Sequence, residues 1–87
     1  MNAEVLEAID NLVHSIYTTE QTGVNEYFMA LLDALELFVN RMNQAGYQVD
    51  INKELLRIQE AFTKKDYVML ADVLLDEVRP EFENLNV

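Results

Sequence analysis

Apolar residues recur every three to four positions along four stretches of the chain, which is the spacing of one face of an α-helix. The pattern predicts helices over residues 3–17, 23–45, 50 or 52 to 63, and 67–85. The inward faces are Val5, Ile9, Leu12, Val13 and Ile16; then Val24, Tyr27, Phe28, Leu31, Leu32, Leu35, Phe38, Val39 and Met42; then Ile51, Leu55, Ile58 and Phe62; and last Tyr67, Leu70, Ala71, Leu74, Val78, Phe82 and Leu85. The second helix has the broadest apolar arc, so we expect it to touch most of the others.

Residues typical of helix ends flank these stretches. Thr22 is a suitable N-cap for the second helix, and Gly46 suits a left-handed C-cap after it. Either Asp50 or Asn52 caps the third helix, and Asp66 caps the fourth.

Pro80 interrupts the last helix, because it has no amide hydrogen and its ring crowds the carbonyl of Asp76. The apolar positions Phe82 and Leu85 nevertheless stay in phase with those before the proline. We therefore expect a helix that bends at Pro80 and continues.

The short connections favour neighbouring helices that run in opposite directions. The sequence thus predicts an all-α fold, an antiparallel up-down four-helix bundle with a proline-kinked last helix. At 87 residues it fits one domain spanning 1–87.

The chain is strongly acidic, with 16 Asp and Glu against six Lys and Arg, a net charge of −10. Such a charge repels phosphate backbones and anionic lipid, so we expect no nucleic-acid partner and no membrane partner. A basic protein partner is compatible with it. The absence of cysteine, the acidic amphipathic N-terminal stretch and the lack of a long apolar run fit a cytoplasmic protein.

Few residues could carry chemistry. His14 follows Asp10 by one helical turn, a spacing that can bind a metal, but neither a second histidine nor a Glu-x-x-His motif is present. An ordinary surface histidine is the favoured interpretation.

The carboxylate pairs Asp33 with Glu36 and Asp72 with Asp76 are placed on solvent-facing sides of their helices. Acid–base catalysis needs carboxylates in contrasting, partly buried environments. We predict no catalytic residue, no metal and no cofactor. A small-molecule or metal-dependent enzyme that uses these carboxylates is the alternative, and an inert monomeric bundle is another.

A second, weaker apolar stripe lies beside the main one. It comprises Ala30, Ala34 and Leu37 on the second helix, and Met69 and Val73 on the last. Neighbouring helices could cover these positions, but small residues also allow a partner helix to approach. We predict that these five residues bind a protein partner or a second copy of the chain.

Residues 65–80 contain Lys65-Asp66-Tyr67, Leu70-Ala71-Asp72 and a proline one turn after Glu77. This segment, and more loosely the third helix, resembles small uncharacterised acidic helical-bundle proteins of Gram-positive bacteria. The resemblance implies a bacterial helical bundle and no particular activity. The sequence therefore favours a non-enzymatic accessory or binding module.

Overall fold

The computed structural model describes residues 2–18 and 23–84, and all regular structure within them is helical. The helices are α1 (Ala3–Tyr17), α2 (Val24–Gln44) and α3 (Asn52–Thr63), followed by one helical stretch made of α4 (Tyr67–Val73), the π-helix η1 (Leu74–Val78) and α5 (Arg79–Glu83). The predicted all-α class is confirmed for these residues. The expected cap Thr22 and the last apolar position, Leu85, lie outside them.

The end of α2 is closed by a turn that requires a left-handed residue. Gly46 has φ 92°. Its amide donates to the Asn43 carbonyl at 3.1 Å, and the Tyr47 amide donates to the Met42 carbonyl at 2.9 Å. This pair of bonds is the Schellman motif, and it confirms the C-cap predicted at Gly46.

Aspartates lie at the starts of α3 and α4, but only the second is an N-cap. The N-cap of α3 is Ile51, which has no side-chain capping bond, so the predicted cap at Asp50 or Asn52 is wrong. Asp50, one residue before the N-cap, accepts a hydrogen bond at Oδ1 from the amide of Asn52, the first residue of α3, at 2.9 Å. Asp66 Oδ1 accepts from the Met69 amide at 3.0 Å, as predicted.

The last helical stretch passes through Pro80 without ending. Its irregularity begins about one and a half turns earlier, at Leu74, where the helix widens to a π-turn and the Arg79 amide donates to the Leu74 carbonyl. Pro80 cannot donate to the Asp76 carbonyl, and a wider turn accommodates that missing bond. The helix continues and buries Phe82, as the sequence predicted.

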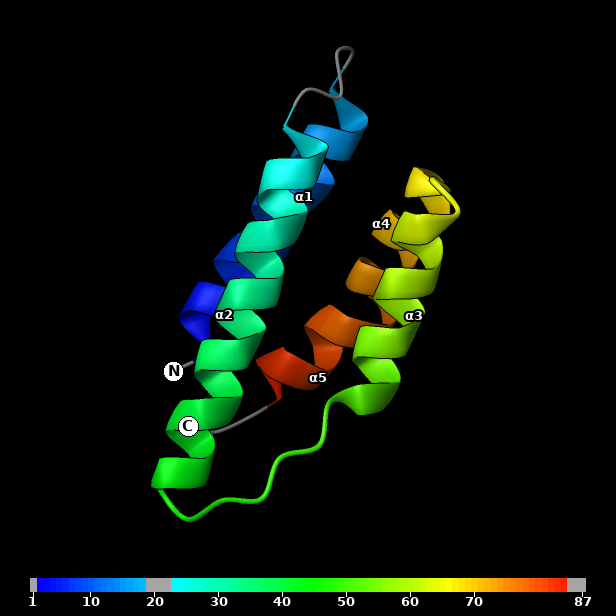
Figure 1. Ribbon diagram of the computed structural model, residues 1–87. Coiled ribbons are helices and arrows are strands. Elements are labelled where there is room, and N and C mark those ends of the chain that lie inside the picture. Colours follow the sequence, from blue (N-terminus) through cyan, green and yellow to red (C-terminus); the bar gives the residue numbers. More distant parts are fainter. Residues whose placement is uncertain (1, 19–22, 85–87) are drawn as a thin grey trace.

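The helices form an elongated body of 42 × 20 × 19 Å over the described residues. In Figure 1, α1 lies beside α2, and α3 lies beside α4. The contacts place α1 against the α4–α5 stretch as well, so these elements are central and α2 and α3 are outermost.

The backbone of α2 is close only to α1. Within the described residues, no Cα of α2 lies within 8 Å of a Cα of α3, α4 or α5. Side chains span the separation instead. Phe28 stacks on Phe62 of α3 with ring centroids 3.9 Å apart, and Phe38 meets the edge of Phe82 of α5 at 5.0 Å. The second helix thus reaches its expected neighbours through its side chains rather than by close backbone packing.

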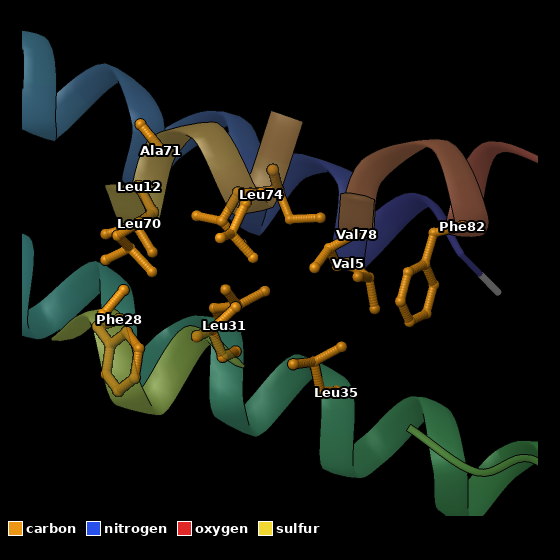
Figure 2. Packing of buried hydrophobic residues seen from close by; sticks show 14 of the residues in the cluster. Val5, Leu12, Phe28, Leu31, Leu35, Leu70, Ala71, Leu74, Val78 and Phe82 are labelled. Atoms are coloured by element: carbon orange, nitrogen blue, oxygen red, sulfur yellow. The ribbon is translucent and has the colours of Figure 1, made fainter. Parts of the chain in front are cut away.

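Figure 2 shows the core, in which Leu31 and Leu35 of α2 point toward Leu70, Leu74 and Val78. Leu31, Ile58 and Leu74 are fully buried and Leu35 is 2% exposed, as their helical phase predicted. The one polar core side chain among the described residues, Ser15, donates to the Leu12 carbonyl at 2.7 Å. No described helix has the combination of length and apolar character needed to cross a lipid bilayer.

Candidate partner-binding groove

A groove of about 560 Å³ lies between α2 and the segment that leads from the α2–α3 linker into α3. Its apolar lining is Leu32, Leu35 and Val39 from α2 together with Val49, Ile51 and Leu55. Its polar lining is Glu36, Asn40, Asp50, Asn52 and Gln59. The groove is therefore apolar in its depth and polar at its edges, which is the usual construction of a binding site.

The helical phase of each wall explains which residues line the groove. On α2, residues 32, 35, 36, 39 and 40 share one face because they follow the i, i+3, i+4, i+7, i+8 spacing. On the opposite wall, residues 51, 55 and 59 are four apart and also share a face. Leu35 is buried, whereas Leu32, Val39 and Leu55 are half-buried, so solvent reaches an apolar surface.

Two structural features keep the walls apart. The linker from residue 45 to residue 51 crosses from α2 to α3, as Figure 1 shows. Farther along α2, the stacked rings of Phe28 and Phe62 bridge the same two helices. The groove lies between these two connections, so its width is set by covalent structure at one end and by packed aromatic rings at the other.

The charge of the groove is uniformly acidic. Glu36 and Asp50 are its two charged lining residues, and its lining contains no basic residue. The basic residues of α3 nearest the linker face elsewhere: Lys53 and Arg57 line a small separate hollow beside η1 and α5. There Arg57 Nη2 bonds Glu77 Oε2 at 2.7 Å.

The residues predicted to bind a partner on α2 lie on a different flank. Ala30 is exposed, Leu37 is 41% exposed, and Ala34 is half-buried against the core. Arg41, one turn beyond Leu37, bonds Glu4 of α1 at 3.3 Å. This flank therefore faces the α1 side of the helix, and none of its three residues lines the groove.

The predicted residues on the last helix lie elsewhere again. Met69 is half-buried and Val73 is 4% exposed. Both line a shallow hollow with acidic neighbours, among them Asp72 and Asp76. The structure thus does not bring the two predicted flanks together in one described hollow. Val73 packs into the core beside Leu70, so its side chain is not available to a partner as predicted.

The candidate chemical residues are dispersed. His14 is exposed, and the Asp10 carboxylate forms an ion pair with Arg79, with Oδ1 2.9 Å from Nη1, instead of orienting the imidazole. Asp33 and Asp72 are likewise exposed, as are the carboxylates paired with them in the sequence. Within residues 2–18 and 23–84, no three His, Asp or Glu side chains are placed to hold a metal ion.

One carboxyl pair is electrostatically perturbed. A hydrogen bond with Glu54 of α3 raises the pKa of Glu81 on α5, and burial and the charge of Glu54 raise that pKa further. Glu54 Oε2 is buried and has no other hydrogen-bond partner among the described residues. The raised pKa favours the protonated form of Glu81, which can donate to Glu54 across α3 and α5.

The sequence did not predict the groove, because the helical pattern places its apolar residues in the core, apart from Val49, which lies in the linker. A signal was present in the lengths of the helices. α3 has 12 residues and α2 has 21, so at 1.5 Å per residue they are about 18 Å and about 32 Å long. A shorter α3 leaves part of the broad apolar arc of α2 uncovered.

These features define an acidic, all-helical domain with an apolar groove between two outer helices. The chain belongs to the DUF8042 family, which is described as a domain of unknown function and whose model matches residues 1–87. Comparisons with curated proteins and with solved structures give no match.

Proposed function

We propose that this domain is a non-enzymatic binding module that takes the apolar face of a partner helix into the groove between α2 and α3. The observation that carries the proposal is the half-buried apolar lining of the groove, with Leu32 and Val39 on one wall and Leu55 on the other. Helices bind such grooves through side chains at i, i+3 or i+4, and i+7.

The shape of the groove favours a helix over a compact ligand. Its lining on α2 runs from residue 32 to residue 40, about 12 Å, which is the length of about two turns of a partner helix. Its lining is only half covered, whereas a small-molecule site encloses most of its ligand.

Self-association is a second candidate, favoured by the exposed residues Ala30 and Leu37 on the α1 side of α2. This flank offers less apolar surface than the groove, because Ala30 has only a methyl group and Ala34 already packs against the core. A dimer through this flank would leave the groove free.

The test uses an amphipathic helical peptide whose apolar face is leucine and whose polar face is uncharged glutamine. Added to isotopically labelled protein, it should shift the NMR amide signals of residues that line the groove. The substitution V39Q places a polar amide in the groove and should weaken binding at least fivefold. L37Q, the matched control on the other flank of α2, should leave it unchanged.

Light scattering on the same three proteins measures self-association. A dimer abolished by L37Q, combined with peptide binding that V39Q does not weaken, would overturn the groove as the binding site and favour the flank. Circular dichroism at each step verifies that both variants remain helical.

We also propose a cytoplasmic location, which the cysteine-free sequence supports, and a bacterial source, which the resemblance of residues 65–80 supports. The antiparallel up-down topology is proposed in the same way. The side-by-side packing of α1 with α2 and of α3 with α4 supports it.

A further inference from the structure

We infer that the partner helix is basic, with Lys or Arg flanking its apolar face, and that Glu36 and Asp50 recognise those cations. This inference rests on the proposed function and specifies the chemistry of the occupant. It follows from the charges that line the groove and from where the basic residues of the domain are engaged.

The two recognising carboxylates stand on opposite walls. Glu36 comes from α2 and Asp50 from the linker that enters α3. Both are exposed, and neither makes an ion pair with another described residue. Asp50 Oδ1 accepts a hydrogen bond from the Asn52 amide, which fixes the carboxylate in place and leaves its other oxygen for a cation.

The domain does not neutralise these charges itself. Along α2 from residue 24 to residue 40 there are three carboxylates and no basic residue. Four of the six basic residues of the chain form ion pairs with carboxylates outside the groove. These pairs are Arg41 with Glu4, Arg57 with Glu77, Lys64 with Glu60, and Arg79 with Asp10 and Glu83. The groove thus keeps a negative potential that a cationic partner can satisfy.

The negative charge also makes a second copy of the chain a poor occupant of the groove. Each copy carries a net charge of −10. In a two-fold symmetric contact through this groove, Glu36 and Asp50 would face the same acidic patch of the other copy. Like charges placed across an interface disfavour that association.

The geometry sets the pattern expected in the partner. A helix laid along the groove presents three apolar side chains at i, i+3 or i+4, and i+7 to Leu32, Val39 and Leu55. Cations on the two sides of that stripe then reach Glu36 on one wall and Asp50 on the other. A basic amphipathic helix with at least two turns in the groove has this arrangement.

The experiment compares three peptides with the same leucine face and with lysine, glutamine or glutamate on the flanks. Fluorescence anisotropy gives each Kd, and NMR shifts locate each peptide. At low salt, we expect the lysine peptide to bind at least tenfold more tightly than the glutamate peptide, with glutamine between them. The ratio should shrink in 0.5 M NaCl, where the Debye length is about 4 Å.

The double substitution E36Q/D50N tests the two recognising residues. Asparagine keeps the oxygen that accepts from the Asn52 amide, so the fold is retained. We expect the lysine peptide to lose about three- to tenfold in affinity, the effect of two exposed charge pairs. The control D72N/D76N removes the same amount of charge from the hollow on α4 and η1. It should change the affinity for the lysine peptide less than twofold.

The outcomes separate the two proposals. Equal affinity for the lysine and glutamate peptides in the groove would overturn the basic partner and leave the helix-binding function standing. Equal weakening by E36Q/D50N and D72N/D76N would overturn recognition by Glu36 and Asp50, since net charge alone would then explain binding. If none of the peptides shifts the NMR amide signals of the residues that line the groove, the proposed function itself is overturned.

Discussion

Lys65 gives the sharpest prediction about stability, because a residue with a Cβ occupies a position that suits glycine. It has φ 57°, in the left-handed region. At the end of α3, its amide donates to the Phe62 carbonyl at 3.0 Å, and the Asp66 amide donates to the Ala61 carbonyl at 3.0 Å. This is the same Schellman motif that ends α2 at Gly46, built without glycine.

The magnitude follows from two opposing terms. A residue with a Cβ is strained by about 1–2 kcal/mol in the left-handed conformation. Replacing Lys65 with glycine relieves this strain. It also makes the unfolded chain more flexible, which lowers the free energy of unfolding by about 0.4–1 kcal/mol. K65G should therefore raise the free energy of unfolding by about 0.5–1 kcal/mol. For a domain of this size that corresponds to an increase in Tm of about 2–8 °C.

Two controls isolate the backbone term. K65A removes the exposed charged side chain but keeps the Cβ, so it measures the loss of the side chain alone. G46A makes the reverse change at α2. A Cβ at Gly46 meets no atom within 4 Å, so its cost is purely conformational and should be about 1 kcal/mol.

Thermal and urea unfolding followed by circular dichroism measure all three variants. An unchanged or lower Tm for K65G, relative to K65A, would refute the reasoning. It would mean that the left-handed backbone at Lys65 is not strained, or that α3 does not end in this turn in solution.

Three further predictions concern the core and the charges. L74A removes a fully buried side chain and should cost about 3–5 kcal/mol, seen as a large fall in the urea midpoint. A loss below 1 kcal/mol would contradict its place in the core. E81Q should stabilise the domain at pH 7 by a few tenths of a kcal/mol. Because the pKa of Glu81 is raised in the folded state, that benefit should disappear as the pH falls below the unfolded value of about 4.3, where wild type is protonated. Urea titrations at pH 7 and pH 4 measure it, and a benefit that grows in acid would contradict the sign. Finally, NaCl raised from 10 to 150 mM should increase Tm by screening the net charge of −10, and a calorimetric decrease would contradict the expected repulsion.

The helix boundaries were largely predictable because local chemistry sets them. The periodic apolar residues define α1 from Ala3 to Tyr17, and glycine or aspartate at the ends placed the turns at Gly46 and Asp66. The end of α3 was also predicted, at residue 63, but its left-handed turn was not, because Lys65 adopts a conformation that its residue type disfavours. The π-turn that begins at Leu74 also lacked a local signal, because it accommodates a proline one and a half turns later.

The candidate site was less predictable because it depends on distances between helices. Helical phase correctly placed Leu32 and Val39 beside the core, yet phase cannot tell whether a neighbouring helix covers them. The same limit applies to Val73, whose position beside the main stripe fits a flank or a core residue equally well, and which the structure buries. Sequence periodicity gives the direction of a side chain from its own helix axis. It does not give the separation of that axis from the next one.

That separation has a physical origin in two aromatic residues, one on α2 and one on α3. Phe28 and Phe62 meet face to face between α2 and α3, and two stacked rings occupy space that would otherwise allow the backbones to approach. Smaller side chains there would let α3 close onto α2 and fill the groove with Leu32, Val39 and Leu55. The rings that stabilise the core at this end thus also prevent the domain from covering its own apolar surface nearer the linker. A partner helix would then complete packing that the rings and the short α3 leave open.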